Sequence, residues 1–574
     1  MANKSLKELG RMKPEDQAVY MNLRAAAQTR VVELEHLEGS PYFNKFKIVD
    51  DKKEEKEFYL SKHQLSEENI YSWVSPVAAI RFENPGDASY RLPDGTSKKI
   101  FIKEKEQHLI VGGNVIFFSR EELDKPRDLI YQEHFTKQKS EFALPEIVAQ
   151  IEKAQDQVIR ASHRGPLVIS GPAGSGKTTL ALHRVAYLTQ APDTSEFYPP
   201  ESIIVFVQDM GTKKYFSTLL PGLGINNVQI TTFYEWAMTA LDLKEYSYVD
   251  RYGEDEEKKD LYEYQKLQAL RSNPVLFWSK NIFKTMQLNY EKYFSANNSK
   301  LFEKQKKEKK LDRFDLVFML RAYLEKNKNF ELKKEYNVFV KDEIVTKIKK
   351  TKILFSLIIV DEFQNYLPEQ LSIMKACLDK NTDSTVYVGD IAQQVKLGTL
   401  KKLEDFGEIV QPDRNIKLNK VYRNTKNILL FIQGLGYKVE IPKEVKDGPN
   451  VVEKIINSKE EEVSYIRDHI AGYKEGSIGI ISKDESYLTL FKTEFNENKN
   501  IHVLTMYESQ GVEFDLVFVV GVRDCMFSVT HHVDVSPEHI EERKKIQKDL
   551  LYVSLTRAIT ELHITGVDKL GRVE

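Results

Sequence analysis

The chain has 574 residues, of which 41% are hydrophobic and 30% are charged, and its formal net charge is −2. A chain of this length is expected to form roughly three or four domains. The near-neutral balance excludes a protein that binds nucleic acid through overall basicity, so such a partner needs a local basic surface. The two cysteines, Cys377 and Cys525, lie far apart and exclude a disulfide framework or a cysteine-rich metal cluster.

Targeting and membrane-spanning segments are not expected. Residues 1–16 contain no apolar run of the secretory type. The longest apolar runs, such as residues 353–360, are far shorter than the roughly 20 residues that a membrane helix requires. We therefore predict a cytoplasmic protein with no membrane partner.

The first 145 residues are predicted to hold one helix and a small β-rich module. Residues 14–37 have the spacing of a charged amphipathic helix. Residues 40–118 carry short β-type runs, broken by turn signals at 84–87 and 92–95. Residues 119–163 favour helix again and lead into the next motif.

A glycine-rich turn between a predicted strand and a predicted helix follows at 167–182, LVISGPAGSGKTTLAL. Residues 171–178 fit the pattern G-x-x-x-x-G-K-T, in which backbone N–H groups and a helix N-terminus form a cradle for phosphate. Lys177 is expected to reach the β- and γ-phosphates, and the Thr178 hydroxyl to bind Mg²⁺. The expected nucleotide-binding residues of this loop are Gly171, Gly174, Ser175, Gly176, Lys177, Thr178 and Thr179.

Strands alternate with helices beyond this loop, which predicts an α/β fold with parallel sheets. The first sheet is expected from strands at 202–208, 228–232, 352–362 and 385–390. Residues 241–352 interrupt it as a mostly helical insertion, whose lysine-rich stretch 304–310 fits either a solvated face or a phosphate-contacting surface. A second α/β unit is expected after residue 406, with strands at 478–482, 501–505, 516–522 and 562–566.

Acidic side chains end two strands of the first predicted sheet. Asp361 and Glu362 follow a buried run, and carboxylates at the carboxyl edge of a parallel sheet face the ligand crevice. Asp361 is expected to hold Mg²⁺, and Glu362 to orient or deprotonate the attacking water. Asp390 and Gln393 repeat the pattern one strand later.

Two arginines from the distal half can complete such a site. Arg423, beside Tyr422, and Arg557, in a helical context, both belong to the second predicted α/β unit. An arginine supplied from another domain stabilises charge on the γ-phosphoryl group, an effect of about 10³–10⁵ in rate. The sequence therefore predicts an ATP site between two α/β units.

Seven segments in this order resemble superfamily 1 helicases of the UvrD/Rep type. They are GPAGSGKT (171–178), TTFYEWA (231–237), DEFQ (361–364), GDIAQQ (389–394), VYRNT (421–425), ESQGVEFD (508–515) and YVSLTRA (552–558). The resemblance implies two RecA-like domains: the first at 146–240 and 353–405, interrupted by 241–352, and the second at 406–574 with a vestigial insertion near 435–475. It further implies ATP and Mg²⁺ as cofactors and 3′–5′ movement on single-stranded or partly duplex DNA.

Within this family, three stretches resemble the HelD branch, whose members are helicase-IV-like motors that bind bacterial RNA polymerase. These stretches are residues 73–95, 146–160 and 211–237. The resemblance covers most of the chain outside 241–352.

The resemblance also implies individual roles. Gln155 reads the adenine, Tyr422 stacks near the base, and Glu513 contacts the ribose. Gln393 senses the γ-phosphate, which Arg423 and Arg557 also meet. The expected nucleic-acid contacts are Thr232, Phe233 and Thr505.

Four departures from the family pattern stand out. Gln510 replaces the usual lysine, which affects a nucleic-acid or phosphate contact, and Asn365 stands where many relatives carry aspartate, which affects coupling between domains. Only about 75 residues separate Asn424 from Ile501, too few for the large extra subdomain of UvrD-type enzymes. The segment 14–37 gives a helix of about 36 Å at 1.5 Å per residue, short for the arm that HelD proteins insert into polymerase.

Three functions remain open from the sequence. The first is an ATP-dependent 3′–5′ DNA helicase or translocase. The second is a HelD-like ATPase that recycles stalled RNA polymerase. The third is an accessory helicase of a defence or repair system that works with a separate nuclease.

Overall fold

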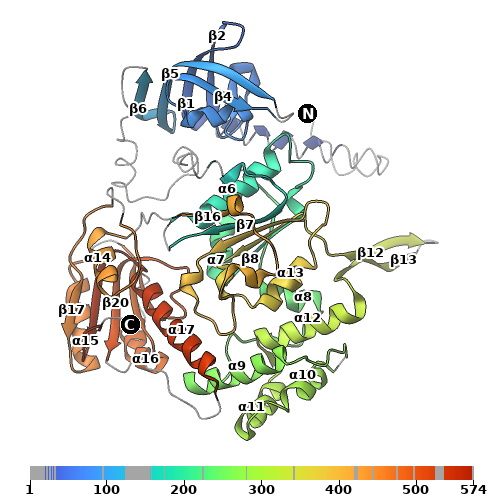
Figure 1. Cartoon of the computed structure of the whole chain (residues 1–574), viewed down its shortest axis with the longest axis vertical. Helices are drawn as coiled ribbons and strands as arrows, with labels where there is room; N and C mark the ends of the chain where they lie inside the picture. Colours follow the sequence, from blue (N-terminus) through green and yellow to red (C-terminus); the bar gives the residue numbers. More distant parts are fainter. Residues whose placement is uncertain are drawn as a thin grey trace. The chain divides into compact units, whose positions relative to one another are not determined.

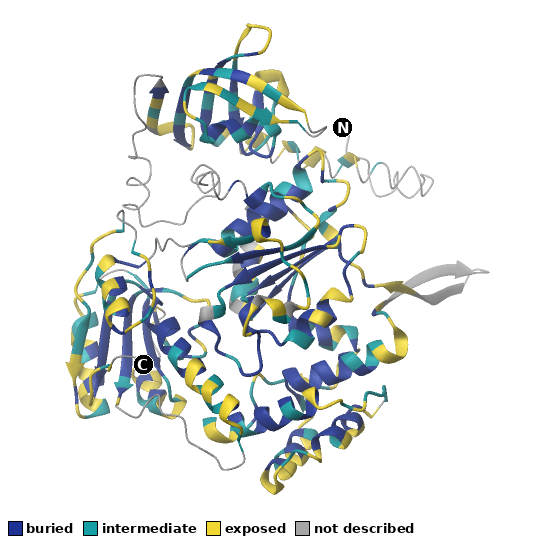
Figure 2. Ribbon diagram, viewed as in Figure 1, coloured by how far each residue is buried: buried dark blue, intermediate teal, exposed yellow. Residues whose placement is uncertain are grey.

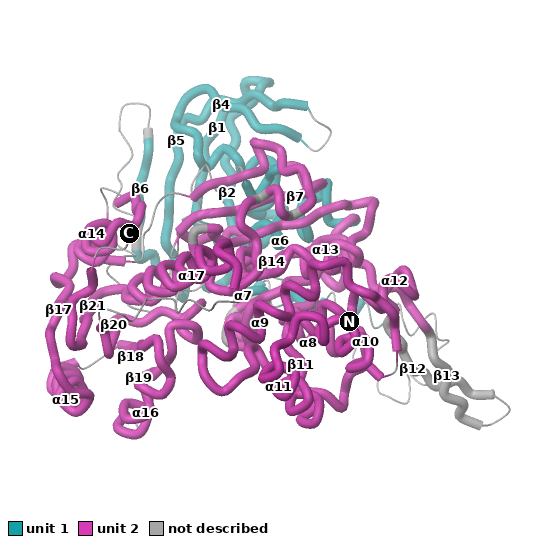
Figure 3. Tube along the Cα trace, turned by 60° about the horizontal axis from the view of Figure 1, so that its bottom comes forward, with its two compact units in different colours: residues 1–161, 183–196, 219–226 teal, residues 162–182, 197–218, 227–574 magenta. Residues whose placement is uncertain are grey.

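A computed structural model describes residues 37–92, 96–122, 158–172, 175–222, 225–279, 281–340, 343–418, 424–441, 445–473, 476–495, 500–523 and 535–571, with scattered positions in 20–35, Asp156 and Asn498. The chain divides into two compact units (Figure 3). The first unit comprises residues 1–161, 183–196 and 219–226, and the second comprises the rest. No described helix is long and apolar enough to cross a membrane.

The first unit contains a six-stranded sheet in the order β3-β2-β1-β5-β4, with β6 paired to β5. Its core includes the stacked rings of Phe46 and Phe58, whose centroids lie 5.2 Å apart, and the buried Trp73. The strands are β1 (Asn44–Val49), β2 (Glu55–Ser61), β3 (Ile70–Ser72), β4 (Gly86–Arg91), β5 (Ser97–Val111) and β6 (Asn114–Glu122).

This sheet corrects one sequence expectation. Residues 119–122, predicted to start a helical stretch, belong to strand β6, because their backbone pairs with residues 104–107 of β5. The rest of that predicted stretch up to residue 155 lies outside the described residues.

The second unit holds two parallel sheets (Figure 1). The first has the order β16-β7-β15-β14-β8-β9, and every pairing in it is parallel. Its central strands read as continuous apolar runs because both faces of a parallel sheet are covered (Figure 2). The strands are β7 (Gly165–Ser170), β8 (Ile203–Val207), β9 (Gln229–Thr232), β14 (Leu357–Asp361), β15 (Ser384–Gly389) and β16 (Asn415–Lys417).

Strand β16 extends this first sheet beyond residue 405. It pairs with β7, and Arg414 just before it donates hydrogen bonds to the carbonyls of Ser162, Gly165 and Pro166. The helices of this part are α6 (Lys177–Gln190), α7 (Met210–Gly222), α8 (Phe233–Ala240) and α13 (Pro368–Lys375).

The segment 241–352 combines helices with a β-hairpin. Its helices are α9 (Glu256–Arg271), α10 (Ile282–Tyr290), α11 (Ala296–Lys307) and α12 (Arg313–Asn327). The hairpin of β12 (Glu331–Val340) and β13 (Glu343–Lys352) was not predicted, and β10 (Ser247–Tyr248) and β11 (Lys310–Leu311) form a short parallel pair.

A buried charge cluster holds the helices of this segment together. The Lys266 ammonium on α9 lies 2.6 Å from Asp312 Oδ2 and 2.9 Å from Asp315 Oδ1, and all three side chains are buried. Asp312 also caps α12 by accepting hydrogen bonds from its first N–H groups. Removing one partner would leave a buried charge unpaired, so we expect this cluster to fix how α9 packs on α12.

The second parallel sheet has the order β17-β21-β20-β18-β19. Its strands are β17 (Val452–Ile455), β18 (Ile478–Ser482), β19 (Ile501–Thr505), β20 (Phe514–Val522) and β21 (Ala558–Gly566). Its helices are α14 (Lys426–Gly434), α15 (Lys459–Ile470), α16 (Glu485–Glu494) and α17 (Pro537–Leu555).

Helix α17 joins the parts of the second unit. Asp549 accepts a hydrogen bond from the backbone N–H of Gln394, 3.0 Å away, at the edge of the first sheet. Arg543, on the same helix, forms an ion pair with Asp260 of α9. The segment that carries the second sheet is therefore docked on both the first sheet and the helical segment.

Candidate nucleotide-binding site

A cavity of about 280 Å³ lies in the second unit beside the start of α6. Its walls come from the glycine-rich loop, from the carboxyl ends of β8 and β14, and from segments flanking β20 and α17. The predicted nucleotide residues that line it are Gly176, Lys177, Thr178, Thr179, Asp361, Glu362, Gln393, Glu513 and Arg557.

Other predicted residues lie elsewhere or outside the described part. Gly171 lies at the end of β7, where a Cβ atom would approach the Leu418 carbonyl oxygen to 2.2 Å, so only glycine fits. Ser175 is buried within the loop. The expectations for Gln155, Gly174, Tyr422 and Arg423 fall on positions outside the described residues.

The start of α6 carries the groups that are predicted to face phosphate. Lys177 Nζ donates a hydrogen bond to the Pro172 carbonyl, 2.9 Å away, so its ammonium folds over the loop. The first N–H groups of a helix have no partner within the helix, and the positive end of the helix dipole lies among them. The loop and this helix end are therefore suited to hold a polyphosphate.

Next to the start of α6, the carboxyl end of β14 carries Asp361, whose Oδ1 accepts a hydrogen bond from the Thr178 hydroxyl, 3.1 Å away. Burial raises the pKa of the Asp361 carboxyl to about 8; the charge of Glu362 adds to the rise and the Thr178 hydrogen bond opposes it. A divalent cation fits this pair, because Mg²⁺ prefers carboxylate and hydroxyl oxygens and its charge favours the ionised carboxyl.

Glu362 adopts a left-handed backbone conformation, with φ of 50° and ψ of 46°. This conformation is costly for a residue with a Cβ atom, and such strain concentrates at functional sites. The Gln364 amide donates a hydrogen bond to Glu362 Oε2, 2.6 Å away. The carboxylate is therefore oriented at the cavity wall.

Gln364 also ties two strand ends together. Its Oε1 accepts a hydrogen bond from the Asp390 backbone N–H at 2.9 Å, and Asp390 Oδ2 in turn accepts one from Gln393 Nε2 at 2.7 Å. A Cβ atom on Gly389 would lie 2.1 Å from Gln364 Oε1. Glycine at 389 is thus required for this bridge between the ends of β14 and β15.

The second sheet contributes a fixed guanidinium. Arg557 is 5% exposed, and its Nε and Nη1 donate hydrogen bonds to the carbonyls of Val553, 2.9 Å away, and Val512, 3.1 Å away. Arg557 and Lys177 line the same cavity. One positive group therefore lies on each side of it.

Two departures from the family pattern meet in this cavity. Asn365 Nδ2 donates a hydrogen bond to Gln510 Oε1, 3.1 Å away, and Asn365 Oδ1 accepts one from the Val395 backbone N–H. The expectations drawn from the sequence concern these two positions separately. In the structure they form one neutral amide pair that joins the first sheet to the second.

The residues predicted to contact nucleic acid have structural partners. Thr232 is buried and caps α8 through Glu235, and Phe233 packs against Phe206 and Trp236 in the core. Thr505 donates its hydroxyl hydrogen to Glu508 Oε2 at 2.9 Å. Their contact with nucleic acid stays a prediction.

Several lining residues were missed from the sequence, namely Gln208, Asp209, Thr212, Phe216 and Gly511, whereas Gln510 was noted only as a departure from the family pattern. Gln208 and Asp209 directly follow β8, the neighbour of β14, so the strand-end argument used for Asp361 could have found them. Gln510 and Gly511 belong to a turn after β19, which no strand-end argument selects.

Two parallel sheets around a phosphate-binding loop define a P-loop protein with two RecA-like domains. The model of the UvrD/REP helicase N-terminal domain matches residues 151–395, and that of the UvrD-like helicase C-terminal domain matches residues 486–569. The chain belongs to the superfamily 1 helicases of the UvrD/Rep type.

Named relatives agree with this family. The chain is 25% identical over 376 residues to a probable DNA helicase II homolog of Mycoplasma capricolum, covering 58% of this chain and 49% of that protein. It is 24% identical to the ATP-dependent DNA helicase PcrA of Staphylococcus epidermidis, covering 49% and 39%. It is 25% identical to the ATP-dependent DNA helicase Rep of Buchnera aphidicola, covering 32% and 24%.

The chain thus spans about half or less of the length of these relatives. A solved C-terminal domain of a possible DNA helicase from Lactobacillus plantarum aligns with 26% of this chain and 91% of that domain at 22% identity; its TM-score of 0.20 is too low for a structural comparison. None of these relatives is named as a member of the HelD branch, so the resemblance to that branch stays a prediction.

Proposed function

We propose that the chain is an ATP-dependent superfamily 1 motor that couples ATP hydrolysis to 3′–5′ movement on single-stranded DNA. The observation that carries this proposal is the single cavity lined by Lys177 and Asp361 on one side and by Glu513 and Arg557 on the other. A nucleotide there would contact both sheets, so its hydrolysis would change the contact between them.

The proposed chemistry uses the side chains around the cavity. Lys177 and Arg557 stabilise the charge that develops on the γ-phosphoryl oxygens, and Glu362 orients the attacking water. Thr178 and Asp361 would hold Mg²⁺, which neutralises phosphate charge when bound. Gln393 would sense the γ-phosphate through its hydrogen bond to Asp390, and Glu513 would contact the ribose.

Helix α17 is proposed to carry the conformational change. It ends two residues before Arg557, and its Glu542 Oε1 accepts a hydrogen bond from the Gly398 N–H, 2.7 Å away, on the first-sheet side. Opening the cavity would break this contact and the one between Gln394 and Asp549. ATP binding and product release would then alternately close and open the two sheets around the nucleotide.

DNA is the proposed substrate because the matched relatives are named DNA helicases. Two rings next to Phe233, those of Tyr234 and Tyr248, stack with centroids 4.2 Å apart, and Lys396 and Arg313 line the same small hollow. Aromatic rings beside cations suit single-stranded nucleic acid, where stacking contributes about 1–3 kcal/mol per base. We therefore place the candidate strand contact here.

The test measures ATP hydrolysis by the full chain with and without a single-stranded DNA oligonucleotide. We expect DNA to stimulate hydrolysis, Lys177→Ala to abolish it, and Tyr234→Ala to raise the DNA concentration that gives half-maximal stimulation. Lys284→Ala, an exposed change on α10, is the control. A rate that no nucleic acid changes would rule out the motor function.

A HelD-like role with RNA polymerase rests on sequence resemblance alone, and an accessory role with a nuclease is an alternative that the genome neighbours would test. Co-purification from a nuclease-treated bacterial lysate separates them: core polymerase retained on the chain would favour the first, and a retained nuclease the second.

A further inference from the structure

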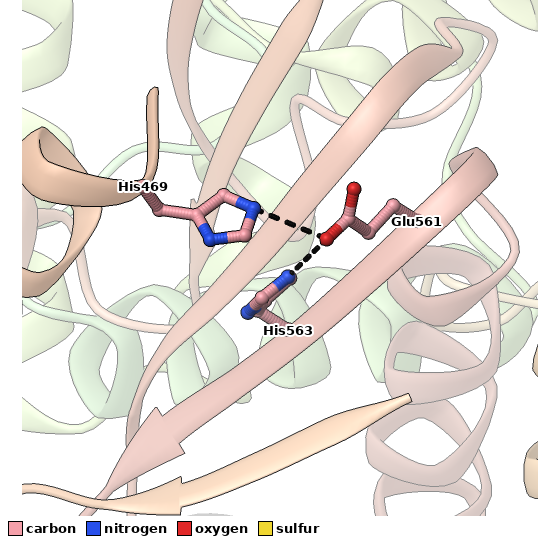
Figure 4. A group of neighbouring side chains, drawn as sticks. All are labelled: His469, Glu561 and His563. Atoms are coloured by element: carbon pink, nitrogen blue, oxygen red, sulfur yellow. Dashed lines mark hydrogen bonds and ion pairs between the residues drawn. The ribbon is translucent and has the colours of Figure 1, made fainter. Parts of the chain in front are cut away.

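Three potential metal ligands converge on the second sheet, away from the nucleotide cavity (Figure 4). His469 Nε2 lies 3.1 Å and His563 Nε2 lies 2.7 Å from the same oxygen, Glu561 Oε1. All three candidate ligand atoms lie within 4.8 Å of one another. In the described part of the chain, none of the three lines the nucleotide cavity.

The fold brings these residues together from two elements. Glu561 and His563 are two residues apart on β21 and so point to the same face of the sheet, while Leu562 and Ile564 pack into the core on the other face. His469 lies in the last turn of α15, which covers the first of these faces. The convergence therefore depends on α15 packing against β21.

A second layer of contacts orients His563. Its Nδ1 lies 2.7 Å from the Tyr465 hydroxyl, and its ring lies 5.0 Å from that of Phe518. A histidine that binds a metal through one nitrogen usually donates its other N–H to such a partner, which fixes the ring and the tautomer.

We propose that His469 Nε2, Glu561 Oε1 and His563 Nε2 bind one Zn²⁺ ion, which ties α15 to β21. Zinc bonds of about 2.0–2.2 Å place tetrahedral ligands roughly 3.3 Å apart. The two distances to Glu561 are already close to this value, and a shift of His469, whose side chain is 30% exposed, brings the third pair into range. The exposed side of His469 leaves the fourth position to water.

Ligand chemistry separates this site from the nucleotide site. Two imidazole nitrogens and one carboxylate select zinc or another transition metal, whereas the oxygen ligands around Thr178 and Asp361 select Mg²⁺. The competing explanation is a plain hydrogen-bond cluster in which Glu561 accepts one N–H from each histidine. Zinc binding replaces both hydrogen bonds, and each neutral imidazole then carries its proton on Nδ1 instead of Nε2, whereas the cluster binds no metal.

The experiment titrates ZnCl₂ into the EDTA-treated, desalted full chain by calorimetry in excess Mg²⁺. We expect one high-affinity Zn²⁺ per chain, and Co²⁺ in its place should give the visible absorption of a tetrahedral site. His469→Ala and His563→Gln should each remove this binding. Tyr465→Phe should weaken it by about 10–100-fold while keeping the stoichiometry.

Two controls keep the result decisive. His502→Ala, an exposed histidine on β19, should bind Zn²⁺ like the wild type, as should a double alanine variant of the adjacent pair His531 and His532. Because His469 is partly exposed, His469→Ala tests the site even if His563→Gln does not fold. A wild-type chain that takes up no Zn²⁺, or a His469→Ala variant that binds it equally well, would overturn the proposal.

Discussion

The two parallel sheets contribute to the nucleotide cavity in different ways. The first sheet supplies strand ends whose side chains are buried and held by hydrogen bonds to neighbouring residues, with Asp361, Gln364 and Gln393 at most 6% exposed. The second sheet supplies a turn and a helix end, whose groups reach the cavity only because α17 is docked. The residues from the first sheet are thus positioned by the order of neighbouring strands. The residues from the second sheet are positioned by packing between segments that are distant in the sequence.

Among the strand-end residues of the first sheet, changing Glu362, the proposed catalytic carboxylate, should have the largest effect. Glu362→Gln keeps the shape of the side chain but removes its charge, so we expect ATP hydrolysis to fall by about 10²–10⁴ while ATP binding persists. Hydrolysis and equilibrium binding of a fluorescent ATP analogue would be measured on the same preparation. Glu494→Gln, in an exposed ion pair on α16, is the matched control. Equal loss of binding and hydrolysis would instead indicate a role in nucleotide affinity.

Gly389→Ala tests the bridge between strand ends. The new methyl group would lie 2.1 Å from Gln364 Oε1, so Gln364 must move and release Asp390 and Glu362. Overpacking of this kind costs about 1–3 kcal/mol, and we expect a lower melting temperature together with slower hydrolysis. Gly434→Ala on α14, where a Cβ atom meets nothing within 4 Å, should change neither. Wild-type hydrolysis by Gly389→Ala would show that the bridge is dispensable.

The amide pair between the two sheets can be tested by charge replacement. Asn365→Asp or Gln510→Lys alone places a charge opposite a neutral partner and should slow DNA-stimulated hydrolysis. The double variant forms an ion pair and should recover most of the rate, with a coupling of about 0.5–3 kcal/mol. Higher salt should slow the double variant more than the wild type. Additive effects of the two changes would show that the pair does not couple the sheets.

The sequence predicted well those parts of the fold and the site that depend on residues close together in the chain. The predicted strands at 478–482 and 501–505 match β18 and β19. The acidic residues at the ends of two first-sheet strands were found because each directly follows a single apolar run in the sequence. The hairpin β12–β13 was missed because lysine and glutamate are depleted in strands. The pair of Asn365 and Gln510 was missed because 145 residues separate its members and only docking of α17 brings them together.

A pH effect, the smallest expected here, should arise where α17 meets the helical segment. Burial lowers the pKa of His539 to about 4; the charges of Glu542 and Glu263 oppose this shift, Lys401 adds to it, and the Tyr264 ring lies 4.1 Å away. Below its ordinary pKa of about 6.5 the unfolded chain binds a proton that the folded chain does not. The stability from this group is therefore complete above pH 6.5 and is lost as the pH falls towards 4.

Melting temperatures between pH 7.5 and pH 5 would measure this contribution. We expect His539→Gln to flatten the decline relative to the wild type, and the exposed His502→Gln to leave it unchanged. An unaltered pH profile for His539→Gln would assign the decline to other groups.

The central claim is that one nucleotide is held by both sheets, and Arg557→Ala tests it most directly. The rate of DNA-stimulated ATP hydrolysis, measured with ATP saturating, should fall by about 10³–10⁵ for this variant, while Arg467→Ala, an exposed arginine on α15, should keep the wild-type rate. Hydrolysis by Arg557→Ala at the wild-type rate would contradict the account, because the second sheet would then take no part in the reaction.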